Sequence, residues 1–228
     1  MLEIIATSVE DAIVIEKGGA DRIELVSALS EGGLTPSYGL VHRVIGAVNI
    51  PVNVMIRPHS MSFVYSDEDL LCMLEDIKQA KALGANGVVF GMLDSQGNIA
   101  IPQLEMLLGH CQGLEVTFHR AIDQAKDILA ATELLASMPI HRVLSSGGPG
   151  QAQSNLAILR QMRDIFDKPG KRLLAGSGVN LENCQAILQV AHELHVGTSV
   201  RNNFSAFESI NLEAVKEMVQ AYKNAKGD

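Results

Sequence analysis

Short apolar segments recur along the chain, each followed by a polar or glycine-rich corner and then by a longer amphipathic stretch. The apolar segments are rich in Val, Ile and Leu, which favour β-strands, and the longer stretches have the spacing of helices. The eight predicted strands cover residues 2–6, 22–25, 52–56, 87–90, 114–118, 142–144, 172–175 and 193–196. Alternating strands and helices of this kind form a parallel sheet that is covered by helices.

The number of strands favours a closed barrel. Open doubly wound sheets normally use about five or six strands, whereas a TIM barrel uses eight. No linker, low-complexity tract or change of composition divides the chain. We therefore predict an α/β protein that forms a single (β/α)8 TIM barrel with parallel strands over residues 1–228.

Helix boundaries can be predicted from capping residues. A Ser, Thr or Asn before an amphipathic stretch favours a helix start, and a glycine in the left-handed conformation favours a helix end. The glycines at positions 18–19 and 84–87 are predicted to end helices. The predicted starts are Ser8, Thr35 followed by Pro36, Ser66 and Asn180.

Charge and cysteine content limit the partners of the chain. A formal net charge of −8 disfavours non-specific attraction to nucleic acid or to an anionic membrane. The sequence has no apolar run of the length that spans a bilayer, and it does not begin with a basic signal segment. We therefore expect a cytoplasmic protein with neither partner. Cys72, Cys111 and Cys184 are widely spaced and odd in number, so we expect isolated buried thiols.

Polar residues gather where the predicted strands end, and the site of a TIM barrel lies at the carboxyl ends of its strands. Two arginines there can hold an anion, and an imidazole and a carboxylate can move a proton near neutral pH. An alternative is that Glu24 pairs with Arg57 or Arg120 in a structural charge network. The candidate catalytic residues are Glu24, Arg57, His119, Arg120 and Asp123.

Two glycine-rich corners follow the sixth and seventh predicted strands. Their backbone N–H groups can bind a phosphate or another small anion, although glycines there can also simply permit tight turns. The histidines of the segment His192-Glu193-Leu194-His195 lack the spacing of a zinc-binding HExxH helix, so we predict no metal site. The candidate anion-binding residues are Ser146, Gly147, Gly148, Gly176, Ser177 and Gly178.

Five motifs, taken together and in order, resemble the CutC family over residues 1–200. The resemblance implies a single TIM barrel, a role in cytoplasmic copper homeostasis and self-association, here expected as a homodimer. Candidate dimer contacts are apolar patches on the outer helices or the segment Phe204-Ser205-Ala206-Phe207. The motifs are Gly18-Gly19-Ala20-Asp21-Arg22-Ile23-Glu24-Leu25, Glu31-Gly32-Gly33-Leu34-Thr35-Pro36-Ser37, Val54-Met55-Ile56-Arg57-Pro58, Thr117-Phe118-His119-Arg120-Ala121 and Ser146-Gly147-Gly148.

The chain departs from this family at positions that bear on metal binding, among them Ile5, Val26 and Val64. Ile5 and Val26 stand where many relatives have cysteines. The resemblance implies a Cu(I) ligand, but Cu(I) selects thiolate and thioether donors, which these aliphatic side chains do not supply. We therefore assign no cofactor and no metal-binding residue.

Three functions remain open at this point. The first is a CutC-like role in copper homeostasis, with an anion-binding pocket at the barrel mouth. The second is a phosphate-binding enzyme, an isomerase or lyase that acts on a small anionic metabolite by acid/base chemistry. The third is a scaffold without chemistry, so the sequence does not decide whether the chain is an enzyme.

Overall fold

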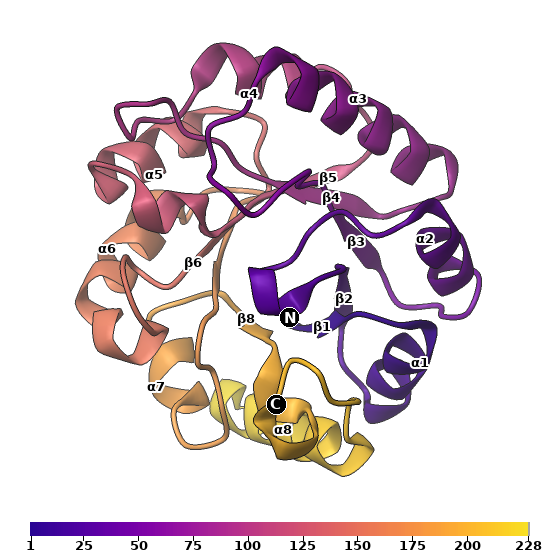
Figure 1. Ribbon diagram of the computed structural model, residues 1–228. Helices are drawn as coiled ribbons and strands as arrows, with labels where there is room; N and C mark the ends of the chain where they lie inside the picture. The colour runs from indigo at the N-terminus through magenta and orange to yellow at the C-terminus, as the bar shows by residue number, and fades with distance from the viewer. Residues whose placement is uncertain (228) are drawn as a thin grey trace.

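The computed structural model describes residues 1–227, and its eight parallel strands close into a barrel in sequence order (Figure 1). The strands are β1 (Leu2–Ala6), β2 (Arg22–Leu25), β3 (Val52–Met55), β4 (Gly87–Phe90), β5 (Glu115–Phe118), β6 (Arg142–Ser145), β7 (Arg172–Ala175) and β8 (Glu193–Val196). The helices are α1 (Val9–Gly18), α2 (Tyr38–Ile45), α3 (Asp67–Ala82), α4 (Ile101–Leu108), α5 (Ile128–Ser137), α6 (Leu156–Phe166), α7 (Cys184–Leu188) and α8 (Leu212–Lys226). The TIM-barrel prediction is confirmed, and each predicted strand is correct to within one residue at either end.

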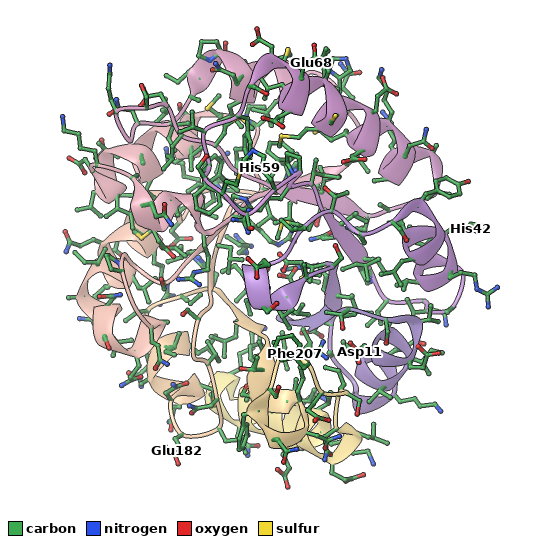
Figure 2. All side chains as sticks on the ribbon, in the orientation of Figure 1. Asp11, His42, His59, Glu68, Glu182 and Phe207 are labelled. Atoms are coloured by element: carbon green, nitrogen blue, oxygen red, sulfur yellow. The ribbon has the colours of Figure 1, made fainter. Side chains whose placement is uncertain are left out.

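The main apolar core lies between the barrel and its ring of helices. Outward-facing strand residues such as Ile4 and Ile23 pack there with the inner faces of the helices, for example through Ile77 of α3. The outer helix faces are polar, and His42 and Glu68 point away from the barrel in Figure 2. Within residues 1–227, no helix has both the length and the apolar character that crossing a membrane requires.

Polar side chains occupy every second position of several strands and fill the inside of the barrel. This alternation is distinct from the apolar alternation of a half-exposed sheet, because here both faces are buried and only the inner one is polar. All of these side chains are buried within the described residues. The set is Glu3, Arg22, Glu24, Asn53, Thr117, Arg142, Glu193 and His195.

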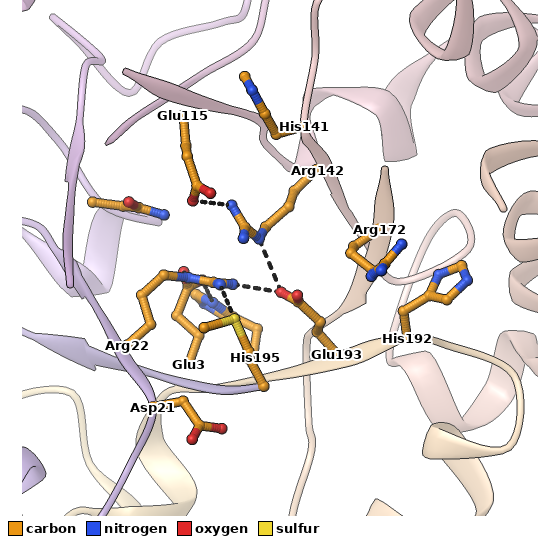
Figure 3. A network of polar contacts seen from close by, with 12 residues as sticks. Glu3, Asp21, Arg22, Glu115, His141, Arg142, Arg172, His192, Glu193 and His195 are labelled. Atoms are coloured by element: carbon orange, nitrogen blue, oxygen red, sulfur yellow. Dashed lines mark hydrogen bonds and ion pairs between the residues drawn. The ribbon is translucent and has the colours of Figure 1, made fainter. Parts of the chain in front are cut away.

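A chain of ion pairs crosses the barrel interior (Figure 3). Arg22 donates to Glu3 and, through Nη2, to Oε2 of Glu193 at 2.7 Å. The same Glu193 oxygen accepts from Nε of Arg142 at 3.0 Å, and Arg142 also pairs with Glu115. Because β8 is not adjacent to β2 or β6 in the barrel, these contacts must run through its interior.

The predicted capping residues mostly end and begin helices as expected. The side chain of Ser8 accepts a hydrogen bond from Asp11 N, and Ser66 forms a capping box with Asp69. Gly19 and Gly84 have φ angles of +88° and +91°, the left-handed conformation that glycine adopts without strain.

Two predicted helix starts are wrong. α2 begins after Ser37, whose side chain accepts from Leu40 N. Thr35 instead joins its loop to the end of β3, because its Oγ1 accepts from Arg57 N at 2.8 Å. Asn180 caps a turn that precedes α7, by accepting from the backbone N–H groups of Glu182 and Asn183.

We predict that Arg22→Met lowers the free energy of unfolding by about 3–5 kcal/mol, because it leaves Glu3 and Glu193 buried without their shared cation. Urea unfolding at neutral pH measures the effect. Arg43→Met, in the exposed last turn of α2, is the control and is expected to change stability by about 0.5 kcal/mol or less. Equal effects of the two substitutions would contradict the structural role of Arg22.

Candidate functional site

A cavity of about 1020 Å³ lies at the carboxyl-terminal mouth of the barrel. The short helix η1 (Leu29–Glu31), which follows β2, lies over the centre of the barrel in Figure 1 and contributes to its wall. All five residues predicted as catalytic line this one cavity, although they come from β2, from the end of β3 and from the segment after β5. They are Glu24, Arg57, His119, Arg120 and Asp123.

Arg57 is a buried cation in this cavity that pairs with no carboxylate of residues 1–227. Its Nη1 donates to the backbone carbonyls of Glu31 at 2.9 Å and Gly33 at 3.1 Å. The ring of Phe63 lies 4.8 Å from its guanidinium carbon, and its Nε has no hydrogen-bond partner. The alternative that Arg57 pairs with Glu24 is therefore wrong, and part of its hydrogen-bonding capacity is unused.

His119 is a neutral imidazole. Its Nδ1 accepts from the backbone N–H of Ala121 at 3.2 Å, so Nε2 carries the proton. That Nε2 is buried without a partner, and the centroids of the His119 and Phe63 rings are 5.0 Å apart. Burial, with the positive charge of Arg57 as a second cause, lowers the pKa of His119 to about 3. The expected pKa near neutrality is therefore not retained, and the Nε2–H of His119 is an unused hydrogen-bond donor.

Asp123 is fully engaged by the protein itself. Its carboxylate accepts from the backbone N–H of Ser146 at 3.0 Å and of Gly148 at 3.4 Å, and from Nε of Arg120 at 2.9 Å. The Ser145 and Ser146 hydroxyls donate to it as well. Asp123 thus positions the loop after β6 and Arg120.

The corner after β6 is accordingly filled from within. Gly147 N donates to Oγ of Ser145 at 2.8 Å, and the N–H groups on either side of it donate to Asp123. An anion at Ser146, Gly147 and Gly148 would have to replace this carboxylate. The glycines of this corner are therefore accounted for by hydrogen bonds within the protein, without a bound anion.

The corner after β7 is more open. Ser177 and Gly178 line the cavity, and their backbone N–H groups donate to no acceptor in the part of the chain that the structure describes. Gly176 has a packing role instead, because a Cβ at this position would lie 2.8 Å from Leu144 Cδ1 and 3.1 Å from His195 Cδ2. Two of the three predicted residues therefore face the cavity with unused donors.

Two residues that the sequence analysis did not assign complete the floor of the cavity. Oε2 of Glu24 lies 3.7 Å from Nε2 of His195, and Nδ1 of His195 lies 2.7 Å from Oε1 of Glu3. Burial raises the pKa of Glu24 to about 7. Burial would lower the pKa of His195, but the carboxylates of Glu24 and Glu3 raise it above its usual value. The signals for these residues were the single charged residue in the apolar strand β1, which is Glu3, and the alternation of polar and apolar residues in β8, which includes His195.

The fold and the position of this cavity define the class of the chain: a TIM-barrel protein with its candidate site at the carboxyl-terminal mouth. The model of the CutC family matches residues 1–201. The chain is 42% identical to the copper homeostasis protein cutC homolog of Homo sapiens over 199 residues, which is 82% of this chain and 73% of that protein. It is 39% identical to a CutC family protein of Proteus mirabilis over 195 residues, 85% of this chain and 77% of the relative. The chain belongs to the CutC family.

A solved CutC structure agrees with this assignment. A CutC structure from Streptococcus agalactiae superposes with a TM-score of 0.79 at 31% sequence identity, and the match covers 87% of this chain and 98% of that one. Thiamine phosphate pyrophosphorylase from Pyrococcus furiosus superposes with a TM-score of 0.65 at 14% identity, over 98% and 96% of the two chains. The second likeness shows the fold alone.

The residues at the barrel mouth do not fit Cu(I). Ile5 and Val26 pack together with Met55 in an apolar cluster inside the barrel, so the neighbourhood offers one thioether and no thiol. No cysteine of residues 1–227 lines the cavity. Burial raises the pKa of Cys111 to about 12, which keeps that thiol protonated. Cys72 lies exposed on α3, so the prediction that its thiol is buried is wrong.

We predict that His119 makes stability fall in acid. The unfolded chain protonates His119 below its ordinary pKa of 6.5, whereas the folded protein does so only near 3. The contribution is therefore complete above pH 6.5 and is lost as pH falls towards 3. Between pH 8 and pH 5, the wild type should lose about 2 kcal/mol more than His119→Asn. Urea unfolding at both pH values tests this, and equal losses would contradict a buried neutral imidazole.

Proposed function

We propose that the mouth cavity binds a small anionic ligand and that the chain acts through this ligand in copper homeostasis, the role in the names of its relatives. The observation that carries the anion proposal is Arg57. A buried guanidinium normally has a carboxylate partner, because an unpaired buried charge is costly. Arg57 has none in the described chain and lines the cavity.

Further donors in the cavity support an anion. Nε2–H of His119 is unpartnered, and the backbone N–H groups of Ser177 and Gly178 are unused. Neutral donors together with one guanidinium suit a carboxylate or phosphate group, which accepts several hydrogen bonds. Arg120 also lines the cavity, but Asp123 already neutralises it.

The low pKa of His119 weighs against the alternative of an enzyme that uses His119 as a general acid. A pKa of about 3 leaves almost no protonated His119 at neutral pH. Binding without His119 as an acid is therefore the better-supported function. The cytoplasmic location and the homodimer remain predictions; the exposed rings of Phe204 and Phe207, the latter labelled in Figure 2, fit a contact between subunits.

We predict that inorganic phosphate, titrated in the millimolar range, raises the Tm of the wild type. Phosphate should bind about 10- to 100-fold more weakly to Arg57→Gln, because this variant loses a charge-assisted contact. Arg57→Lys keeps the charge and should fall between the two. Isothermal titration calorimetry supplies the affinities. Arg43→Gln, on the outside of α2, is the matched control. Equal phosphate affinity of Arg57→Gln and the wild type would overturn the proposed site.

We predict that the reduced wild type does not bind Cu(I) stoichiometrically at micromolar strength, and that Ile5→Cys together with Val26→Cys creates a 1:1 site. The two new thiols would lie beside the thioether of Met55. Anaerobic competition with a Cu(I) chelator measures both proteins. Cys72→Ser in each background removes the exposed native thiol. Equally tight binding by the wild type would show that copper is held elsewhere in the protein.

A further inference from the structure

Three side chains of types that bind metal ions meet on the floor of the mouth cavity. One ligand atom each of Glu3, Glu24 and His195 lies within 4.8 Å of the other two, and all three residues are buried. They come from three adjacent strands, β1, β2 and β8, so the barrel itself sets their separation. Glu24 and His195 line the cavity, whereas Glu3 lies behind His195.

The imidazole of His195 is held in one orientation. Oε1 of Glu3 accepts from Nδ1 at 2.7 Å, and Oε2 of the same carboxylate is fixed by Arg22. Nε2 then faces Glu24. A histidine whose Nδ1–H donates to a carboxylate while Nε2 points to an open site is the arrangement that orients imidazole ligands in metal sites.

The distance between Glu24 and His195 is too long for a hydrogen bond and suits two ligands of one ion. Nε2 and Oε2 are 3.7 Å apart, beyond the range of an N–H···O bond. Two donors about 2.0–2.1 Å from a tetrahedral ion are separated by roughly 3.3 Å. A small movement of either side chain would close the difference.

Glu24 lacks the partners that a buried carboxylate needs. Its side chain is 3% exposed, and Oε1 has no hydrogen-bond partner in the structure. Arg22, the nearest guanidinium along the same strand, is already bound by Glu3 and Glu193. Arg57 lines the same cavity but donates to backbone carbonyls. An unpartnered oxygen at the cavity floor is therefore available to a cation.

We propose that Nε2 of His195 and the carboxylate of Glu24 bind a divalent transition-metal ion of the Zn²⁺ type, with Glu3 orienting the imidazole. One nitrogen and carboxylate oxygens suit Zn²⁺ or Cu²⁺, whereas Cu(I) prefers sulfur. The remaining coordination positions face the cavity, where water or the bound ligand can occupy them. The site does not depend on the anion proposal and can be tested without any anion.

The test is calorimetric titration of the chelator-treated full chain with Zn²⁺ alone, in a buffer free of phosphate. We expect one Zn²⁺ per chain at micromolar affinity or tighter. Glu24→Gln should weaken binding at least tenfold and should fold normally, because Glu24 makes no hydrogen bond in the structure. His110→Asn, with an exposed ring on the outer surface, is the matched control and should bind like the wild type.

A spectroscopic readout separates this site from surface histidines. Cu²⁺ bound in place of Zn²⁺ should show electron paramagnetic resonance coupling to a single imidazole nitrogen, and His195→Asn should remove that coupling. Should His195→Asn fail to fold, Glu24→Gln alone decides the outcome. Absence of stoichiometric binding, or Zn²⁺ affinity in Glu24→Gln equal to that of the wild type, would overturn the proposal. Loss of phosphate binding in Arg57→Gln would leave it untouched.

Discussion

The barrel depends on Arg22, a fully buried guanidinium on β2 that connects this strand to Glu3 of β1 and to Glu193 of β8. A closed barrel of eight strands must fill its centre, and most TIM barrels do so with branched apolar side chains. This chain fills its lower interior with ions instead, so each charge requires a partner at a fixed position. The register of β1 against β2, which pairs Glu3 with Arg22, is therefore fixed by electrostatics as well as by the apolar outer face.

The inward-facing polar residues of β2 and β8 also supply groups to the mouth cavity. Glu24 lies two residues beyond Arg22 on β2, on the same inner face but outside the reach of its guanidinium. His195 is two residues beyond Glu193 on β8 and is tied to the ion network through Glu3. The network thus fixes Glu3 against His195 at the cavity floor and leaves Oε1 of Glu24 without a hydrogen-bond partner. On β2 and on β8, a residue of the ion network and a residue of the candidate site therefore occupy successive inner positions of the same strand.

Much of this structure follows from local sequence. The strands were predictable because apolar β-branched runs are bounded by glycines and caps, and the convergence of Glu24, Arg57 and His119 followed from barrel closure alone. Pairing did not follow, since the partner of each charge depends on which inner positions face each other across the barrel. Thr35 shows a local failure: a plausible helix cap is used instead to hold the backbone of Arg57. Polar residues alternate with apolar ones in β2 and β8, but because both faces of these strands are buried, the alternation did not indicate which residues face the barrel interior.

Family membership and site chemistry must be separated in this chain. The chain matches the CutC family over residues 1–201. Ile5 and Val26, however, have aliphatic side chains that pack with Met55. A soft-metal site depends on its sulfur donors and cannot survive their replacement by aliphatic side chains. A guanidinium without a carboxylate partner, a neutral imidazole and a carboxylate beside a second imidazole remain in the same cavity. The guanidinium is a hydrogen-bond donor, and the imidazoles and the carboxylate are nitrogen and oxygen ligands, so these groups suit oxyanions, protons or harder cations better than they suit Cu(I).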